Sequence, residues 1–183
     1  PREQSFEGIA NFMVTTKGTL SSPEYTLSLR ADDVSFRSVP FGSIRGDFSY
    51  SNRALLSRFD VVNRSVSSGR PQLTVSGTMP INLALSGVEE RLPEAPMNFS
   101  IRSEGIQMSI LDPLLPTFNR LTGLLRCDVK VVGSPRKPDY EGSIRIDSCS
   151  FLFVPNNIVY LLDGSFQPQG DRIKVVDAII RNV

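Results

Sequence analysis

The chain has 183 residues, 40% of them hydrophobic, and its 20 basic and 19 acidic residues leave a net charge of +1. This apolar content supports a sizeable buried face and excludes a chain that is disordered throughout. The near-neutral charge supplies no overall field toward nucleic acid or an acidic membrane surface, so no nucleic-acid partner is expected.

From the N-terminal third onward, apolar and polar residues alternate in short runs. Leu27 and Leu29 alternate with Ser28 and Arg30, a period of two that is typical of a β-strand with one dry face. The same pattern recurs at Leu73 and Val75, at Ile81, Leu83 and Leu85, at Phe99 and Ile101, at Cys127, Val129 and Val131, and at Ile144 and Ile146. Because turn residues separate these runs at short intervals, the sequence predicts an all-β meander forming a one-sided antiparallel sheet.

One segment breaks the alternation. Its apolar residues recur at helical spacing, between the start signal Asp112-Pro113 and the stop signal Gly123: Leu111, Leu114, Leu115, Phe118 and Leu121. This spacing predicts one short helix near residues 111–122, of at most about three turns because Pro116 has to lie in its first turn. The apolar stripe of the helix would rest on an open end of the dry sheet face.

The segment that follows predicts a β-hairpin. Residues 124–132 should fold back on residues 140–147 around the Gly- and Pro-containing turn at 133–138. Cys127 and Cys149 lie in strand-like runs, where a free thiol usually packs as a small apolar group. A disulfide between them stays open as the less favoured alternative, because their spacing does not place them opposite each other in this hairpin.

The chain contains an internal repeat. Residues 18–40 align without gaps with residues 133–155 at an offset of 115, and ten of the 23 aligned positions are identical. After a three-residue insertion the match resumes, with Gly46-Asp47-Phe48 against Gly164-Ser165-Phe166. Repeats of this kind bury a continuous face by stacking. We therefore expect one repeat segment over residues 1–107 and a second over 108–183.

Membrane and processing signals are absent from this sequence. No run approaches the roughly 18 consecutive apolar residues of a membrane helix, and the first residues do not resemble a signal peptide. The chain ends on an apolar run at residues 175–180 that is typical of a strand still in progress. We expect the sequence to be one continuous fragment of a longer protein.

Catalytic motifs are also absent. The chain has no histidine, its two cysteines form no CxxC pair, and no GxSxG, P-loop or dinucleotide-binding motif occurs. Adjacent acids such as Asp32-Asp33 lie at predicted loop positions, where solvated surface is the usual interpretation. We expect no catalytic residue, no metal and no cofactor, and therefore no enzyme.

The order of motifs over residues 108–182 resembles the repeat unit of TamB-like proteins in the AsmA-like group. The segment contains a Leu-Asp-Pro-Leu-Leu-Pro helix motif, a Pro-Asp-Tyr-Glu-Gly turn, the run Ser143-Ile144-Arg145-Ile146, a Val-Pro step and a closing Asp163-Gly164-Ser165-Phe166. Residues 18–60 resemble the same unit. The resemblance implies a curved antiparallel sheet that forms a taco-like groove with an apolar interior.

The resemblance also implies a location and partners. Such a protein would lie in the periplasm of a diderm bacterium, held in the inner membrane by an anchor outside this sequence. It would move phospholipids between the inner and outer membranes, or assist outer-membrane protein assembly beside an Omp85-type barrel such as TamA. The physics agrees, since each acyl methylene buried in a dry groove gains about 0.8 kcal/mol.

Three functions compete at this point. The first is a conduit for phospholipid or another acyl-chain ligand, whose predicted lining is Leu27, Leu29, Phe36, Leu73, Val75, Leu83, Phe99, Ile101, Val129, Val131, Ile144, Ile146 and Phe151. The second is an assembly scaffold whose strand edges pair with client β-strands. The third is an adhesive or purely structural repeat in which a second sheet closes the dry face.

Overall fold

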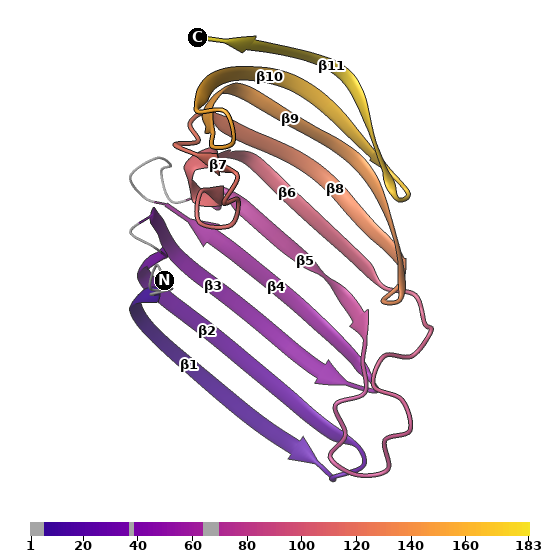
Figure 1. Ribbon diagram of the computed structural model, residues 1–183. Helices are drawn as coiled ribbons and strands as arrows, with labels where there is room; N and C mark the ends of the chain where they lie inside the picture. Colours follow the sequence, from indigo (N-terminus) through magenta and orange to yellow (C-terminus); the bar gives the residue numbers. More distant parts are fainter. Residues whose placement is uncertain (1–5, 37–38, 64–69) are drawn as a thin grey trace.

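The computed structural model describes residues 6–36, 39–63 and 70–183, which form one antiparallel sheet (Figure 1). The strands are β1 (Phe6–Gly18), β2 (Pro23–Phe36), β3 (Val39–Ser51), β4 (Ala54–Val62), β5 (Leu73–Pro80), β6 (Asn98–Gln107), β7 (Phe118–Asn119), β8 (Leu124–Ser134), β9 (Lys137–Phe153), β10 (Ile158–Gln169) and β11 (Arg172–Asn182). Each strand pairs with the next along the chain, except that β6 pairs with β8 and the short β7 adds to the end of β9. The all-β meander is therefore confirmed.

The sheet is open. β1 and β11 lie at its opposite edges, and Figure 1 shows β9, β10 and β11 arching away from the straighter strands β1 to β5. Within the described ranges, no second sheet packs on the first. These residues therefore do not form the two-sheet sandwich that an adhesive domain would need.

The strand register gives the sheet two chemically different faces. Leu29 pairs with Gly46, Gly46 with Phe59, Phe59 with Val75, and Val75 with Ile101. Directly paired residues point to the same side of a sheet, so these side chains form a row across neighbouring strands. We call this side the apolar face.

The opposite side, here called the polar face, carries the charged residues of the strands. Asp47 lies opposite Arg58, and Arg102 lies opposite Asp128. Within single strands, Arg30 binds Asp32 and Arg145 binds Asp147, with N–O distances of 2.9 and 2.6 Å. Alternation along each strand thus separates apolar from charged side chains.

The hairpin predicted around residues 133–138 is confirmed. β8 and β9 pair continuously from Leu124 opposite Asp147 to Ser134 opposite Lys137. Cys127 and Cys149 are free thiols and are not joined by a disulfide.

The internal repeat is visible in the backbone. Gly18 and Gly133 have φ angles of 83° and 87°, and each pairs with a proline at or next to the start of the following strand, Pro23 and Pro138. The repeat is not exact: Leu27 pairs with Phe48, whereas Ile144 pairs with Phe166, a difference of two residues between the aligned strands. A shift of two keeps every side chain on the same face.

The helix predicted near residues 111–122 is wrong in extent and place. The structure has a single 3₁₀ turn, η1 (Met108–Leu111), followed by turns and β7. Asp112 does not begin a helix but follows the end of η1. Its Oδ1 accepts a hydrogen bond from the N–H of Leu121 at 2.8 Å, and Arg120 adopts a left-handed φ of 56°. Pro113 and Pro116 have no N–H groups for a helical ladder, so the segment forms turns that still press its apolar side chains onto the sheet.

The strand predicted at Ile81, Leu83 and Leu85 is also wrong. Residues 81–97 form a long connection between β5 and β6 without a strand. The Oδ1 of Asn82 accepts a hydrogen bond from the N–H of Ala84, and the N–H of Leu83 binds the Tyr50 hydroxyl. Such side-chain partners compete with ladder hydrogen bonds, so alternation alone did not make this segment a strand.

Candidate functional site

The predicted lining residues fall almost entirely on one connected surface. Leu27, Leu29, Leu73, Val75, Phe99, Ile101, Val129, Val131, Ile144 and Ile146 belong to paired rows on the apolar face. Phe36 is buried at the end of β2, and Phe151 lies on β9 opposite Tyr160 of β10. Leu83 is the exception, because it lies in the connection between β5 and β6.

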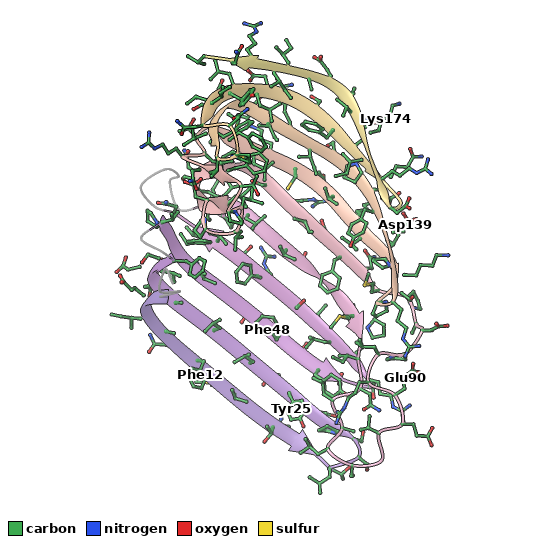
Figure 2. All side chains as sticks on the ribbon, in the orientation of Figure 1. Phe12, Tyr25, Phe48, Glu90, Asp139 and Lys174 are labelled. Carbon is green, nitrogen blue, oxygen red and sulfur yellow. The ribbon has the colours of Figure 1, made fainter. Side chains whose placement is uncertain are left out.

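Most of this face is only half covered. Leu29, Phe59, Val75 and Ile101 are intermediate in exposure. Val129 and Val131, by contrast, are buried in a cluster with Met97. Figure 2 shows Phe12, Tyr25 and Phe48 along the neighbouring strands β1, β2 and β3. Apolar side chains left half-covered over several strands form the kind of surface that usually receives an apolar partner.

Residues 81–97, here called the strap, cover one end of this face. The Oη of Tyr50 accepts a hydrogen bond from the N–H of Leu83 at 2.8 Å, and Tyr50 is only 3% exposed. The guanidinium of Arg91 donates to the carbonyl oxygens of Asn82 and Ala84 at 3.0 and 2.8 Å, which holds the strap in a compact fold.

The strap also joins the two hairpin turns that the repeat places in equivalent positions. The N–H of Leu85 donates to the carbonyl of Leu20 in the β1–β2 turn, and the N–H of Met97 donates to the carbonyl of Gly133 near the end of β8, next to the β8–β9 turn. Arg136 adds an ion pair with Glu90 at 2.6 Å. The pair is largely exposed, so its energetic contribution is small, and the backbone bonds hold the strap in place.

Residues 108–123, here called the flap, cover the other end. Met108 and Leu121 are buried against Cys149, with Leu125, Ile146 and Leu162 packed around them. An aromatic cluster anchors the flap, since the Phe118 ring lies 5.3 Å from Phe151 and 5.6 Å from Phe153. The flap replaces the predicted helix but performs the packing role expected of it.

A concavity of about 410 Å³ opens on the apolar face beside β11. It is lined mainly by apolar side chains, including Ile101, Val129, Ile144 and Ile173, with Cys127 among them. Burial raises the pKa of the Cys127 thiol above its ordinary value, and it does the same for Cys149. Both thiols are therefore protonated and poor nucleophiles at neutral pH.

The polar face has its own charge network. Burial favours the neutral form of Asp60, but hydrogen bonds from Arg58 and Thr74, at 2.9 and 2.6 Å, outweigh it, so the pKa of Asp60 lies below its ordinary value. The same contact raises the pKa of Arg58. These groups are engaged with each other on the side away from the apolar face.

Metal binding and membrane crossing concern the same described residues. In the part of the chain that the structure describes, no group of His, Cys, Asp and Glu side chains is arranged to hold a metal ion. In the same part, no helix is both long enough and apolar enough to cross a bilayer.

Comparison with known proteins adds no assignment. No family model matches the chain, no curated protein matches it, and no solved structure matches it.

Sequence reasoning missed several residues of this surface. Phe48 and Phe59 lie on the apolar face, paired with the predicted lining residues Leu27 and Val75. Tyr50 and Leu55 pair with each other in the adjacent row of the same face. Alternation at Phe48 and Tyr50 carried a signal that could have identified these two, whereas the adjacent Leu55 and Leu56 obscure the period of two before Phe59. The strap had no comparable signal, because its role depends on hydrogen bonds to distant backbone groups.

Proposed function

We propose that this chain is a non-enzymatic groove that carries phospholipids by shielding their acyl chains along its apolar face. The observation that carries the proposal is the row of half-buried side chains at Leu29, Phe59, Val75 and Ile101, which crosses neighbouring strands. A long acyl chain would cover this row and gain about 0.8 kcal/mol for each buried methylene. The polar face would remain in water.

The motif resemblance extends the proposal to a location and a partner. In this view the chain belongs to a TamB-like protein that is anchored in the inner membrane of a diderm bacterium and extends into the periplasm. Phospholipids would pass between the inner and outer membranes, and an Omp85-type barrel such as TamA would be the outer-membrane partner. The ordered motifs over residues 108–182 and their partial copy over residues 18–60 support this extension.

The experiment that tests the binding proposal compares one chemical change on the two faces. Leu29→Glu places a charge in the apolar row, whereas Leu56→Glu places it on the polar face, where Leu56 is 56% exposed. Binding of a fluorescent fatty acid should fall in the first variant and stay unchanged in the second, with both variants folded by circular dichroism. Equal binding in both variants would contradict the proposal.

A second function, a scaffold for outer-membrane protein assembly, is favoured by the free sheet edges. All residues of β11 are exposed, and Phe12 and Met13 on β1 are 72% and 73% exposed. Neither strand has a partner on its outer side within the described ranges. An exposed edge of this kind can accept an additional strand from a client protein.

Lysine substitutions on the edge strand β11 distinguish the scaffold function from lipid carriage. Val176→Lys combined with Ile179→Lys should prevent strand addition at β11, because charged side chains on an edge oppose pairing. A scaffold would then lose its capture of an unfolded outer-membrane strand, measured by cross-linking, while fatty-acid binding persisted. Client capture that survives these changes but disappears with Leu29→Glu would instead assign the interaction to the apolar face.

A further inference from the structure

The phenyl ring of Phe48 lies over Gly46 on the apolar face of β3. A Cβ atom built on Gly46 would stand 2.8 Å from Cε2 and 3.3 Å from Cζ of that ring. Gly46 is not among the glycines with a left-handed φ, so the backbone does not require glycine at this position. What the position requires is room for the ring, which lies along the strand instead of standing away from it.

The second repeat contains the same arrangement. A Cβ atom on Gly164 would stand 3.0 Å from both Cε2 and Cζ of Phe166, and Gly164 also has an ordinary φ. Gly164 and Phe166 are the residues that align with Gly46 and Phe48 in sequence. Both repeats therefore hold a phenyl ring low against the sheet by omitting the side chain two residues before it.

On β3 this low ring lies between the two covering segments. At one end the strap covers Tyr50, which is 3% exposed. Toward the other end η1 of the flap packs against β3, and Val61, the partner of Ile44, is 2% exposed. Between Ile44 and Tyr50, Gly46 is buried beneath the ring of Phe48, and that ring is itself only half-buried, so it forms the surface of the apolar face over this stretch of β3.

We propose that Gly46 and Phe48 set the clearance of the apolar face over β3, meaning how closely an acyl ligand can approach the strand, and thereby disfavour bulky ligands between strap and flap. The inference rests on the proposed lipid-carrying function. A methyl group at position 46 would lift the ring into the space of the ligand. Removing the ring would widen the passage.

The test uses two fluorescent fatty acids of different bulk, the slender cis-parinaric acid and the ring-bearing 1-pyrenedecanoic acid, and measures the ratio of their affinities. Gly46→Ala should weaken pyrenedecanoic acid by about ten-fold relative to parinaric acid, the order of effect that one extra methylene has in a packed apolar site. Phe48→Ala should shift the ratio the other way. The double variant should regain a ratio at or above that of the unmodified protein.

A control variant and an unfolding measurement distinguish an effect on ligand clearance from an effect on protein stability. Ser49→Ala, on the polar face of the same strand, changes an exposed residue opposite Leu56 and should leave the ratio unchanged. An unchanged ratio in both Gly46→Ala and Phe48→Ala, with only the unfolding midpoint altered, would overturn the inference and leave the ring as a cover for a strand glycine. If the unmodified protein bound neither probe, the proposed function itself would fail, which is a distinguishable result.

Discussion

Asp33 and Ser148, 115 residues apart, adopt the same left-handed backbone conformation, with φ angles of 53° and 51°. Each lies at a β-bulge where its strand carries one residue more than the partner strand, between Ala31 and Val34 in β2 and between Ile146 and Cys149 in β9. Bulges bend a strand and increase its twist. The same β-bulge thus occurs at equivalent positions of the two repeats, although the residue at the bulge is Asp in the first and Ser in the second.

The hairpin glycines should be intolerant of substitution. Gly18→Ala and Gly133→Ala each place a Cβ against a backbone oxygen, that of Ser22 and that of Lys137, in a left-handed conformation. We expect each variant to lose about 1–3 kcal/mol of unfolding free energy in urea titrations. Gly87→Ala has a φ of 67° but open space around the new methyl, so it should lose less. Equal losses in all three would show that the close contacts do not matter.

The hydroxyl of Tyr50, which binds the strap, can be removed without removing the ring. Tyr50→Phe leaves the N–H of Leu83 without its acceptor and should cost about 1 kcal/mol of stability. Hydrogen exchange at the Leu83 amide should accelerate in this variant. Tyr25→Phe is the matched control, since Tyr25 stacks on Tyr50 with ring centroids 5.6 Å apart. Unchanged protection of Leu83 in Tyr50→Phe would contradict the hydrogen bond's role.

Acid should weaken the polar face through Asp60. Because the pKa of Asp60 is lower in the folded chain than its unfolded value of about 3.9, its contribution to stability is fully present above that value and is lost as pH falls through the folded pKa. Asp60→Asn should therefore show a smaller loss of unfolding free energy between about pH 5 and pH 2. The measurement is urea denaturation across this range, and an unchanged pH dependence would count against the Arg58 and Thr74 contacts.

The thiols should report ligand binding at the concavity. Burial raises the pKa of both cysteines, so alkylation at neutral pH should be slow for each and slower for Cys149, which is 1% exposed. In a Cys149→Ser background, a bound fatty acid should slow the alkylation of Cys127 further, because Cys127 lines the concavity. Alkylation that is indifferent to the fatty acid would place the ligand elsewhere.

Most of the fold was predictable because a sheet with one apolar face requires apolar and polar residues to alternate along each strand. The runs at Leu27, Val75, Ile101 and Val129 became strands, and the hairpin at residues 133–138 formed as its turn residues indicated. Local chemistry was sufficient there, since each strand had only to match its neighbour along the chain.

The failures came where distant partners decide the local structure. Ile81, Leu83 and Leu85 recur at every second position as in a strand. The N–H of Leu83 nevertheless donates a hydrogen bond to the Tyr50 hydroxyl, and the segment forms the strap. Asp112 resembles a helix cap, but its carboxylate binds the N–H of Leu121 and closes a turn. No local pattern could identify either acceptor.

The most direct test of lipid carriage is native mass spectrometry of the protein purified without detergent, followed by lipid extraction. The proposal predicts phospholipid bound to the unmodified protein and to Leu56→Glu, and its loss from a folded Leu29→Glu variant. A stable, lipid-free chain in all three preparations would contradict the proposal and leave the scaffold as the better account of the exposed strand edges.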